Sequence, residues 1–271
     1  MMVCGFALAL FAMDVSGQPA LATNAVFATS SATDPTRSDG TQLTKPPLHS
    51  ESAPLFHSFN SGPSHEKLIA LTFDDGPHAV ITPKLLDVLR AYKAKATFFV
   101  LGERVKLYPM ILRQIFDEGH EIGNHTYSHR SLAALSTEEI EHEIIETQSL
   151  IKQATGYEPS LFRPPYGAFR SNTRPVFQKH NLNVIMWSVD SKDWSVRNEN
   201  KIYDVVITHA RSGSIVLFHD IHPAILDALP RILDTLVADG YQFITVSELC
   251  GLPPLAPLAP PATRLESLSV K

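Results

Sequence analysis

The chain has 271 residues, of which 44% are hydrophobic and 19% charged, a composition typical of globular proteins. This length allows one large domain or two small ones, and we expect one domain with tails. The net charge is -5 and no long run of Lys and Arg occurs, so electrostatics give no reason to expect a nucleic acid as partner. A neutral or mildly polar substrate fits the composition better.

The N-terminus has the pattern of an export signal. Residues 3–13 form a short apolar run and small residues follow at 20–22, so we expect a signal peptide over residues 1–22 and an exported protein. The run is too short to span a membrane securely, and we expect no stable membrane insertion of the mature chain. The first basic residue is Arg37, so the positively charged start of a typical signal is missing. Loss of Cys4 with the signal would leave Cys250 alone, and no internal disulfide could form.

Two further segments lack a helix or strand pattern. Residues 23–64 are rich in Ser, Thr, Pro and Asn and indicate a flexible N-terminal arm, whereas residues 251–271 form a Pro- and Ala-rich tail. The catalytic domain is therefore expected over residues 65–250.

Between the tails, short strand-like runs alternate with segments whose apolar residues recur at helical spacing. In chain order, the expected elements are strand 68–73, helix 83–92, strand 96–100, helix 109–118, strand 121–124, helix 137–154, strand 161–162, helix 174–180, strand 184–189, helix 202–211, strand 215–218, helix 224–238 and strand 243–246. Ser136 and the acidic residues after it predict a capped start for helix 137–154. This alternation, with nearly continuous apolar strands, predicts a parallel sheet covered on both faces.

The positions of polar motifs distinguish the two architectures that this alternation allows, an α/β barrel and an open sheet. Asp74, His125, Arg163, Asp190 and His219 all lie at or just after the ends of predicted strands. In a barrel these ends meet at one rim, where the active sites of such folds lie. We therefore expect a barrel with its site at that rim.

Asp74 and Asp75 form an adjacent carboxylate pair at the end of an apolar run. A strand end presents successive side chains in different directions, so one aspartate could bind a cation while the other acts on water. The alternative is a plain turn formed by the Asp-Asp-Gly-Pro sequence at residues 74–77. The pair suggests metal-assisted hydrolysis.

His125 and His129 are four residues apart, so a helical turn would place both imidazoles on one face, within reach of one metal ion. Residue 126 is Thr rather than Glu, which excludes the HExxH zinc-protease pattern, and a pair of surface histidines without a metal is the alternative. Two histidines and one aspartate form a ligand set suited to a catalytic Zn²⁺. We assign Asp75 as the carboxylate ligand, which leaves Asp74 free to act as general base.

Five ordered motifs together resemble those of the NodB-type polysaccharide deacetylases, carbohydrate esterase family 4. They are Thr72–Pro77, His125–His129, Arg163–Gly167, Asp190–Trp194 and Leu217–Asp220, within a resemblance that covers residues 67–249. The resemblance implies a distorted (β/α) barrel of about seven parallel strands, the NodB homology domain. It also implies hydrolysis of an N-acetyl or O-acetyl group of a polysaccharide with a divalent metal. Zinc is the expected metal, and cobalt, nickel and manganese are the alternatives.

The resemblance also implies roles for the site residues. It makes Asp74 the general base and Asp75, His125 and His129 the metal ligands, in agreement with the assignment from the residues themselves. Arg163 would orient Asp74 and favour its ionised form. The alternative for Arg163 is a surface salt bridge that contributes little.

The later motifs would supply the acid and the substrate contacts. By the resemblance, His219 is the general acid and Asp193 the partner that favours its charged form. The backbone N–H of Tyr166 would stabilise the oxyanion. Trp194 and Leu217 would line the sugar groove and the pocket for the acetate methyl, with core packing as the alternative.

The expected function is deacetylation of N-acetylglucosamine residues, in peptidoglycan or a chitin-like glycan. An acetylxylan esterase is the nearest alternative, because esters and amides are hydrolysed through similar tetrahedral intermediates. A non-catalytic glycan-binding module is the second alternative, against which the presence of Asp74 and His219 argues. An acetylated polysaccharide is the expected partner, and the sequence indicates no protein partner. Trp187 has no motif role and is expected in the core.

Overall fold

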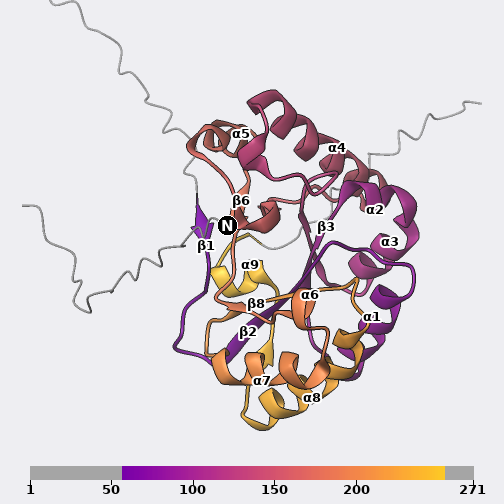
Figure 1. Cartoon of the computed structure of the whole chain (residues 1–271), viewed down its shortest axis with the longest axis vertical. Helices are drawn as coiled ribbons and strands as arrows, with labels where there is room; N and C mark the ends of the chain where they lie inside the picture. Colours follow the sequence, from indigo (N-terminus) through magenta and orange to yellow (C-terminus); the bar gives the residue numbers. More distant parts are fainter. Residues whose placement is uncertain (1–56, 254–271) are drawn as a thin grey trace, which may run out of the picture. The chain divides into compact units, whose positions relative to one another are not determined.

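The computed structural model describes residues 57–253, and this part of the chain is built around a sheet of short parallel strands (Figure 1). The expected signal peptide, most of the expected arm and the tail beyond residue 253 lie outside the described residues. The strands are β1 (Ser58–Phe59), β2 (Leu68–Asp74), β3 (Ala96–Val100), β4 (Glu121–Asn124), β5 (Leu161–Phe162), β6 (Asn183–Ile185), β7 (Val189–Asp190), β8 (Ile215–His219) and β9 (Gln242–Phe243).

The strands pair in parallel in the order β1-β6-β5-β4-β3-β2-β8-β7, and β9 pairs with the start of β2. This arrangement confirms the expected distorted barrel, with nine short strands in place of about seven. β1 is one addition: it precedes residue 65, where we expected the domain to begin, and pairs with β6. The other addition arises because the expected strand 184–189 is divided into β6 and β7.

A buried arginine accounts for the break between β6 and β7. Arg163 follows β5, and its guanidinium donates to the backbone oxygens of Ile185 at 3.1 Å and Met186 at 3.0 Å. These carbonyls therefore bond to a side chain where a continuous strand would use them in its ladder. As a result, β6 pairs with β5 and β1, whereas β7 pairs with β8.

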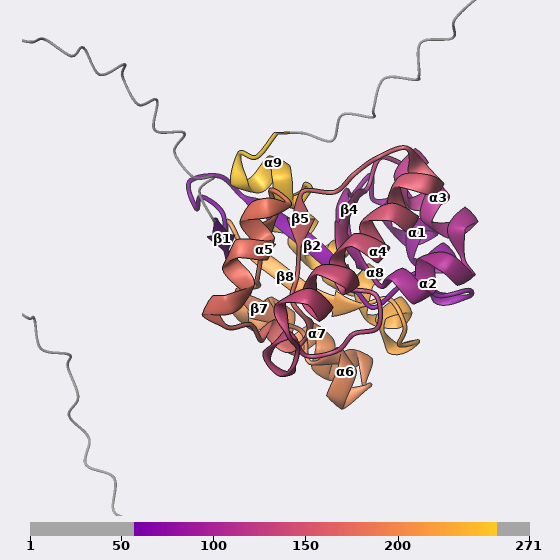
Figure 2. The ribbon, with the colours of Figure 1, turned by 90° about the horizontal axis from the view of Figure 1, so that it is seen from above.

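Helices surround the sheet, as Figures 1 and 2 show. They are α1 (Ile81–Ala91), α2 (Gly102–Leu107), α3 (Pro109–Asp117), α4 (Thr137–Thr155), α5 (Arg174–Lys179), α6 (Asp193–Val196), α7 (Glu199–His209), α8 (Ala224–Ala238) and α9 (Val246–Cys250), with short 3-10 turns at Leu132–Ala134, Pro165–Gly167 and Ser171–Thr173. The helices α1, α3, α4, α5, α7 and α8 lie close to their predicted bounds. The helices α2, α6 and α9 were not predicted.

Capping side chains explain two of these boundaries. Ser136 and Glu139 form a capping box at the start of α4, as the sequence indicated. A second box, formed by Thr245 and Glu248, starts α9. The strand expected over 243–246 therefore ends at Phe243, because the chain turns into this helix.

The core lies between the sheet and the helices. Phe73 of β2 is fully buried and stacks against Phe98 of β3 and Phe218 of β8, with ring centroids 5.1 Å and 5.5 Å away. Leu85 of α1 and Leu229 of α8 belong to the same buried cluster. Burial of such apolar surface contributes roughly 25 cal/mol per Å² and holds the strands in a fixed register.

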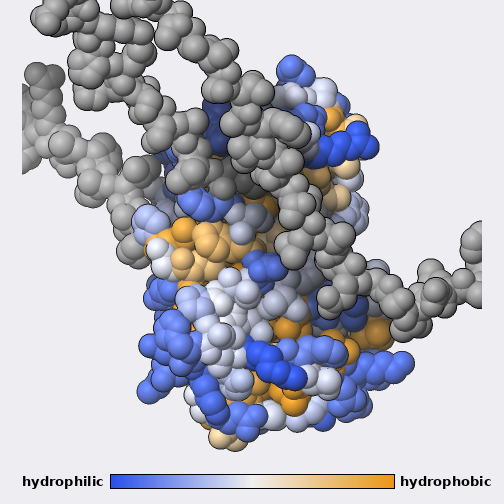
Figure 3. Space-filling view, turned by 90° about the vertical axis from the view of Figure 1, so that its left-hand side faces the viewer, coloured by the Kyte–Doolittle hydropathy of each residue, from blue (hydrophilic) through white to orange (hydrophobic). Residues whose placement is uncertain are grey.

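The part of the surface visible in Figure 3 is mainly hydrophilic, with apolar areas among the polar side chains. Tyr166 and Trp194 are among the large hydrophobic side chains that remain exposed. Within residues 57–253, none of the helices combines the length and the apolar character needed to cross a membrane.

The strand register brings the carboxyl ends of the strands together at one rim. Asp74, the last residue of β2, pairs with His219, the last residue of β8. Arg163 follows β5, and its backbone N–H donates to the backbone oxygen of Asn124, the last residue of β4, at 3.0 Å. His125 comes next in the chain. The polar residues expected at the rim therefore lie side by side.

Candidate active site

Asp75, His125 and His129 form a compact set of ligating atoms at the rim. Asp75 Oδ1 lies 3.6 Å from His125 Nε2 and 3.4 Å from His129 Nε2, and one ligand atom from each of the three residues lies within 4.8 Å of the others. The Asp75 oxygen is buried and has no hydrogen-bond partner. Within residues 57–253, no other group of three or more His, Cys, Asp or Glu side chains comes as close together.

The tautomer of His125 suits a metal ligand. Its Nδ1 lies 2.6 Å from the backbone oxygen of Arg163, to which it donates, so Nε2 keeps its lone pair. Burial lowers the pKa of His125 to about 3, and the imidazole is neutral at ordinary pH. A lone pair that faces an unpartnered carboxylate oxygen is favourable only if a cation lies between them. The three residues therefore fit a divalent cation.

The segment between the two histidines is a bend, so the expected helical turn at residues 125–129 is wrong. The imidazoles do come together, with ring centroids 5.0 Å apart. The backbone achieves this with left-handed conformations at Thr126 (φ 72°) and His129 (φ 59°). Spacing alone predicted the proximity of the rings but not the path of the backbone.

Asp74 is buried beside this set and paired with Arg163. Its Oδ1 accepts from Arg163 Nη1 at 2.7 Å, while Oδ2 lies 3.6 Å from His125 Nε2. Arg163 is fully buried, so the reading of this residue as a surface salt bridge is wrong. The guanidinium also donates to Thr72 Oγ1 at 2.8 Å and lies over the ring of Phe99. Burial raises the pKa of Asp74, and the charge of Arg163 opposes that rise.

His219 faces the same cavity and is paired with Asp193. Its Nδ1 lies 2.8 Å from Asp193 Oδ1, and its backbone N–H donates to Asp193 Oδ2 at 2.7 Å. Burial alone would lower the pKa of His219, but the hydrogen bond and charge of Asp193, with Asp74 and Asp75, raise it to about 9. The imidazolium therefore persists at neutral pH, with Nε2 as the N–H left to donate.

A cavity of about 380 Å³ joins these groups. It is lined by Asp74, Asp75, His125, His129, Pro164, Tyr166, Trp187, Asp190, Trp194, Leu217 and His219. Tyr166 is 70% exposed and Trp194 50% exposed, so both stand at the open side of the cavity, whereas Leu217 is buried. Trp187, which we expected in the core, lies partly buried against the core and also lines the cavity. This difference follows from the break between β6 and β7, which places Trp187 outside a strand.

Asp220 is a buried residue at the rim that the sequence did not bring into the site. Its Oδ2 accepts from the Thr82 hydroxyl at 2.5 Å, and burial raises its pKa to about 7. Gly76 runs so close that a Cβ there would lie 2.1 Å from Asp220 Oδ2. The turn after Asp75 therefore requires glycine at this position.

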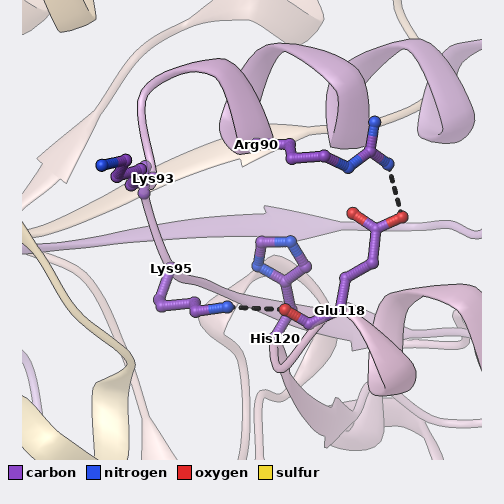
Figure 4. Close-up of a pocket in the computed structure, with 6 residues that line it drawn as sticks. Arg90, Lys93, Lys95, Glu118 and His120 are labelled. Atoms are coloured by element: carbon purple, nitrogen blue, oxygen red, sulfur yellow. Dashed lines mark hydrogen bonds and ion pairs between the residues drawn. The ribbon is translucent and has the colours of Figure 1, made fainter.

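A second cavity, of about 350 Å³, lies near the start of β3 and β4, at the opposite ends of the strands (Figure 4). Arg90 Nη2 donates to Glu118 Oε1 at 2.6 Å, and Lys95 Nζ donates to the backbone oxygen of Glu118 at the same distance. His120 Nδ1 accepts from the N–H of Ala96. Since these cationic side chains are bonded within the protein and no ligand set lies there, the first cavity is the candidate active site.

Sequence comparison identifies relatives of the chain. The family model described as polysaccharide deacetylase matches residues 61–185. The peptidoglycan-N-acetylmuramic acid deacetylase PdaC of Bacillus subtilis is 44% identical over 185 residues, which are 68% of this chain and 39% of that protein. The chain therefore spans about two fifths of the length of this relative.

Solved structures are similar over the same region. The peptidoglycan N-acetylglucosamine deacetylase Bc1960 is 37% identical with a TM-score of 0.71, and the match covers 73% of this chain and 94% of that chain. A pseudoenzyme of carbohydrate esterase family 4 from Bacillus anthracis is 30% identical with a TM-score of 0.68, over 72% of this chain and 69% of that chain. From these matches and the barrel that carries them, the chain belongs to the polysaccharide deacetylase family.

Proposed function

We propose that the protein is a metal-dependent deacetylase that removes acetyl groups from N-acetylglucosamine residues of a polysaccharide, with peptidoglycan as the substrate. One observation carries the proposal: a carboxylate held by a buried arginine and an imidazole held by a buried aspartate line one cavity beside a cation site. Relatives named as peptidoglycan deacetylases support the choice of substrate. Because such a substrate lies outside the cytoplasm, we also propose that the protein is exported.

In this proposal, Asp75, His125 and His129 hold the divalent cation, with zinc as the preferred ion and cobalt, nickel or manganese as substitutes. The bound cation would polarise the acetyl carbonyl and make the attacking water more acidic. The buried Asp75 oxygen without a hydrogen-bond partner is the feature of the chain that most calls for such an ion.

Asp74 acts as the general base. Arg163 donates a hydrogen bond to Asp74 Oδ1. Asp74 Oδ2 is therefore the atom that takes the proton from water as the new C–O bond forms. Tyr166, whose backbone is left-handed (φ 60°), offers its N–H to the oxyanion. Leu217, and the exposed rings of Tyr166 and Trp194, give the cavity the apolar surfaces that an acetyl methyl and a sugar face require.

His219 acts as the general acid. Asp193 holds Nδ1, so Nε2 carries the proton that passes to the amine nitrogen as the C–N bond breaks. The products are acetate and a free amino sugar. The raised pKa of His219, about 9, keeps this donor protonated at neutral pH.

Two other functions remain as alternatives. The same groups would hydrolyse an O-acetyl ester, because the tetrahedral intermediate is similar. A non-catalytic glycan-binding role is the second alternative, because a solved pseudoenzyme shares the fold and the fold alone does not separate the two roles. The buried pairs of Asp74 with Arg163 and of His219 with Asp193 favour catalysis, because a binding module needs neither.

The test is acetate release from peptidoglycan, chitooligosaccharides and acetylxylan, before chelation, after chelation and after zinc is restored. We expect zinc-dependent release from peptidoglycan. Release from acetylxylan alone would favour the esterase, and glycan binding without release under every metal condition would favour the binding module.

Two substitutions separate the proposed roles at the rim. Asp74→Asn should reduce acetate release about 10²–10⁴-fold, as loss of a general base does, while the protein still binds zinc. His125→Ala should weaken zinc binding itself, because it removes a ligand. Equal loss of zinc in the two variants would contradict this division of roles.

A further inference from the structure

We propose that Glu143 of α4 is a positioning residue for the cation site, because its carboxylate fixes the bend between the two histidine ligands and thereby sets the affinity for the metal. The inference rests on the proposed cation site and extends it to a residue outside the five motifs. The bend comprises residues 125–129.

The bend is held in a conformation that the backbone alone disfavours. Thr126, a β-branched residue, has φ 72°, and His129 has φ 59°. A left-handed residue other than glycine costs on the order of 1–3 kcal/mol, so such a bend persists only when its surroundings hold it. The interactions that hold this bend therefore determine whether both imidazoles face one ion.

Glu143 makes three of these interactions. Its Oε2 accepts from the backbone N–H groups of Tyr127 and Ser128, each at 2.8 Å, and its Oε1 accepts from the Ser128 hydroxyl at 2.5 Å. The two residues that it holds lie between His125 and His129. Glu143 is itself only 8% exposed, so most of its side chain is buried.

The helix that carries Glu143 is a firm support for the bend. α4 is 19 residues long and starts with a capping box. It also holds the strand before the bend, because Asn124 Nδ2 donates to the backbone oxygen of Ile144 at 2.9 Å and to Gln148 Oε1 at 3.1 Å. Asn124 Oδ1 in turn accepts from the N–H of Thr126 at 2.8 Å. Both the entry and the middle of the bend are therefore tied to one helix.

Loss of the carboxylate should loosen the bend without unfolding the protein. A cavity of about 270 Å³, lined by Tyr127, His142, Glu143 and Glu146, lies beside it. Water in that cavity could bond to the N–H groups that Glu143 leaves. The effect should therefore appear in the order of the bend and in metal affinity, and not in the global fold.

Three variants test the inference by zinc titration against a competing chelator, with hydrogen exchange of the metal-free proteins as a second measurement. Glu143→Ala should weaken zinc binding about 10–100-fold, as loss of an outer-shell partner does, and speed exchange over residues 125–129. Glu143→Gln should bind zinc nearly as well as the wild type, because the amide oxygen still accepts from both N–H groups. Glu146→Ala, which lines the same cavity from the same helix, is the matched control and should change neither measurement.

Wild-type zinc affinity in Glu143→Ala would overturn the inference, as would an equal loss in Glu146→Ala. Faster exchange in Glu143→Ala with unchanged zinc affinity would also overturn it, because the bend would then not set the affinity. Acetate release, measured on the same samples, tests the proposed function separately. A wild-type protein that binds zinc but releases no acetate would contradict the deacetylase and leave the role of Glu143 supported by its own readouts.

Discussion

Three buried aspartates at the rim differ in their nearest partner, and the partner decides what each carboxyl can do. Asp74 is opposite a guanidinium, Asp193 is opposite an imidazole, and Asp220 is opposite only the hydroxyl of Thr82. The fixed positive charge of Arg163 favours the ionised form of Asp74. The carboxylate of Asp193 favours the protonated form of the His219 imidazole. Asp220, with a pKa raised to about 7 by burial, has no charged partner and instead packs against the turn at Gly76.

Asp193→Asn is expected to move the loss of activity at high pH to a lower pH. In the proposed mechanism His219 must be protonated to act, so its contribution is present below its raised pKa and is lost as pH rises through that pKa. The charge and hydrogen bond of Asp193 are the strongest influences that raise this pKa. Their removal should shift the falling limb of kcat/KM against pH down by about one unit or more.

The control for this shift is Asp87→Asn, which removes a carboxylate that pairs with Arg90, away from the candidate active site. This variant should keep the falling limb of the wild type. If the falling limb of kcat/KM against pH stays in place in Asp193→Asn, deprotonation of His219 is not the cause of the loss of activity at high pH.

The three residues of the candidate cation site were predictable from local pattern, whereas several residues that support the site were not. Asp75, His125 and His129 stand out because a carboxylate pair at a strand end and two histidines at short spacing are readable in sequence. Asp220 meets Thr82 across 138 residues, and Glu143 meets Ser128 across 15. Tertiary packing brings such pairs together, and no periodic pattern in the sequence predicts these contacts.

At the scale of elements, long periodic segments were predictable and short interrupted ones were not. α8 occupies the residues that its apolar spacing predicted, from Ala224 to Ala238. The break between β6 and β7 was missed because its cause, Arg163, lies 22 residues from Ile185 in the sequence. The same arginine that orients Asp74 interrupts the sheet, so a feature of the site overrides the strand preference of residues 184–189.

The junction of β3 and β4 should make the protein less stable in mild acid, because it buries a histidine. His120 is 2% exposed, and its Nδ1 accepts from the N–H of Ala96 at 3.2 Å. Burial, with the charge of Lys95, lowers its pKa to about 4 from 6.5. The unfolded chain therefore takes up a proton at a pH where the folded protein does not. The part of the unfolding free energy that depends on neutral His120 is fully present above about pH 6.5 and is lost as pH falls toward about 4.

Between about pH 7.5 and about pH 5, His120 should account for about 2 kcal/mol of the loss in unfolding free energy. Urea unfolding at both values, with chelator present, measures the loss in the wild type and in His120→Asn, whose side-chain oxygen can still accept from Ala96. The variant should lose about 2 kcal/mol less than the wild type across this interval. An equal loss in both proteins would assign the acid sensitivity to other groups.

At the scale of the whole molecule, the sheet joins distant parts of the chain at one edge. Asp75 follows β2, His125 and His129 follow β4, Arg163 follows β5, and His219 is the last residue of β8. A cation held there would bridge the ends of β2 and β4 and would bind the folded state in preference to the unfolded chain. Metal binding should therefore be measurable as global stability, apart from any turnover.

Zinc is expected to raise the melting temperature of the wild-type protein, since a ligand at a thousand times its Kd adds about 4 kcal/mol to the unfolding free energy. In a domain of this size that corresponds to roughly 10 °C. Calorimetry with chelator and with zinc should show the shift in the wild type and in Asp74→Asn, which keeps the three ligands. The shift should fall sharply in His125→Ala. If His125→Ala kept the full shift, zinc would be stabilising the fold from another site, and the set of Asp75, His125 and His129 could not be the one that holds it.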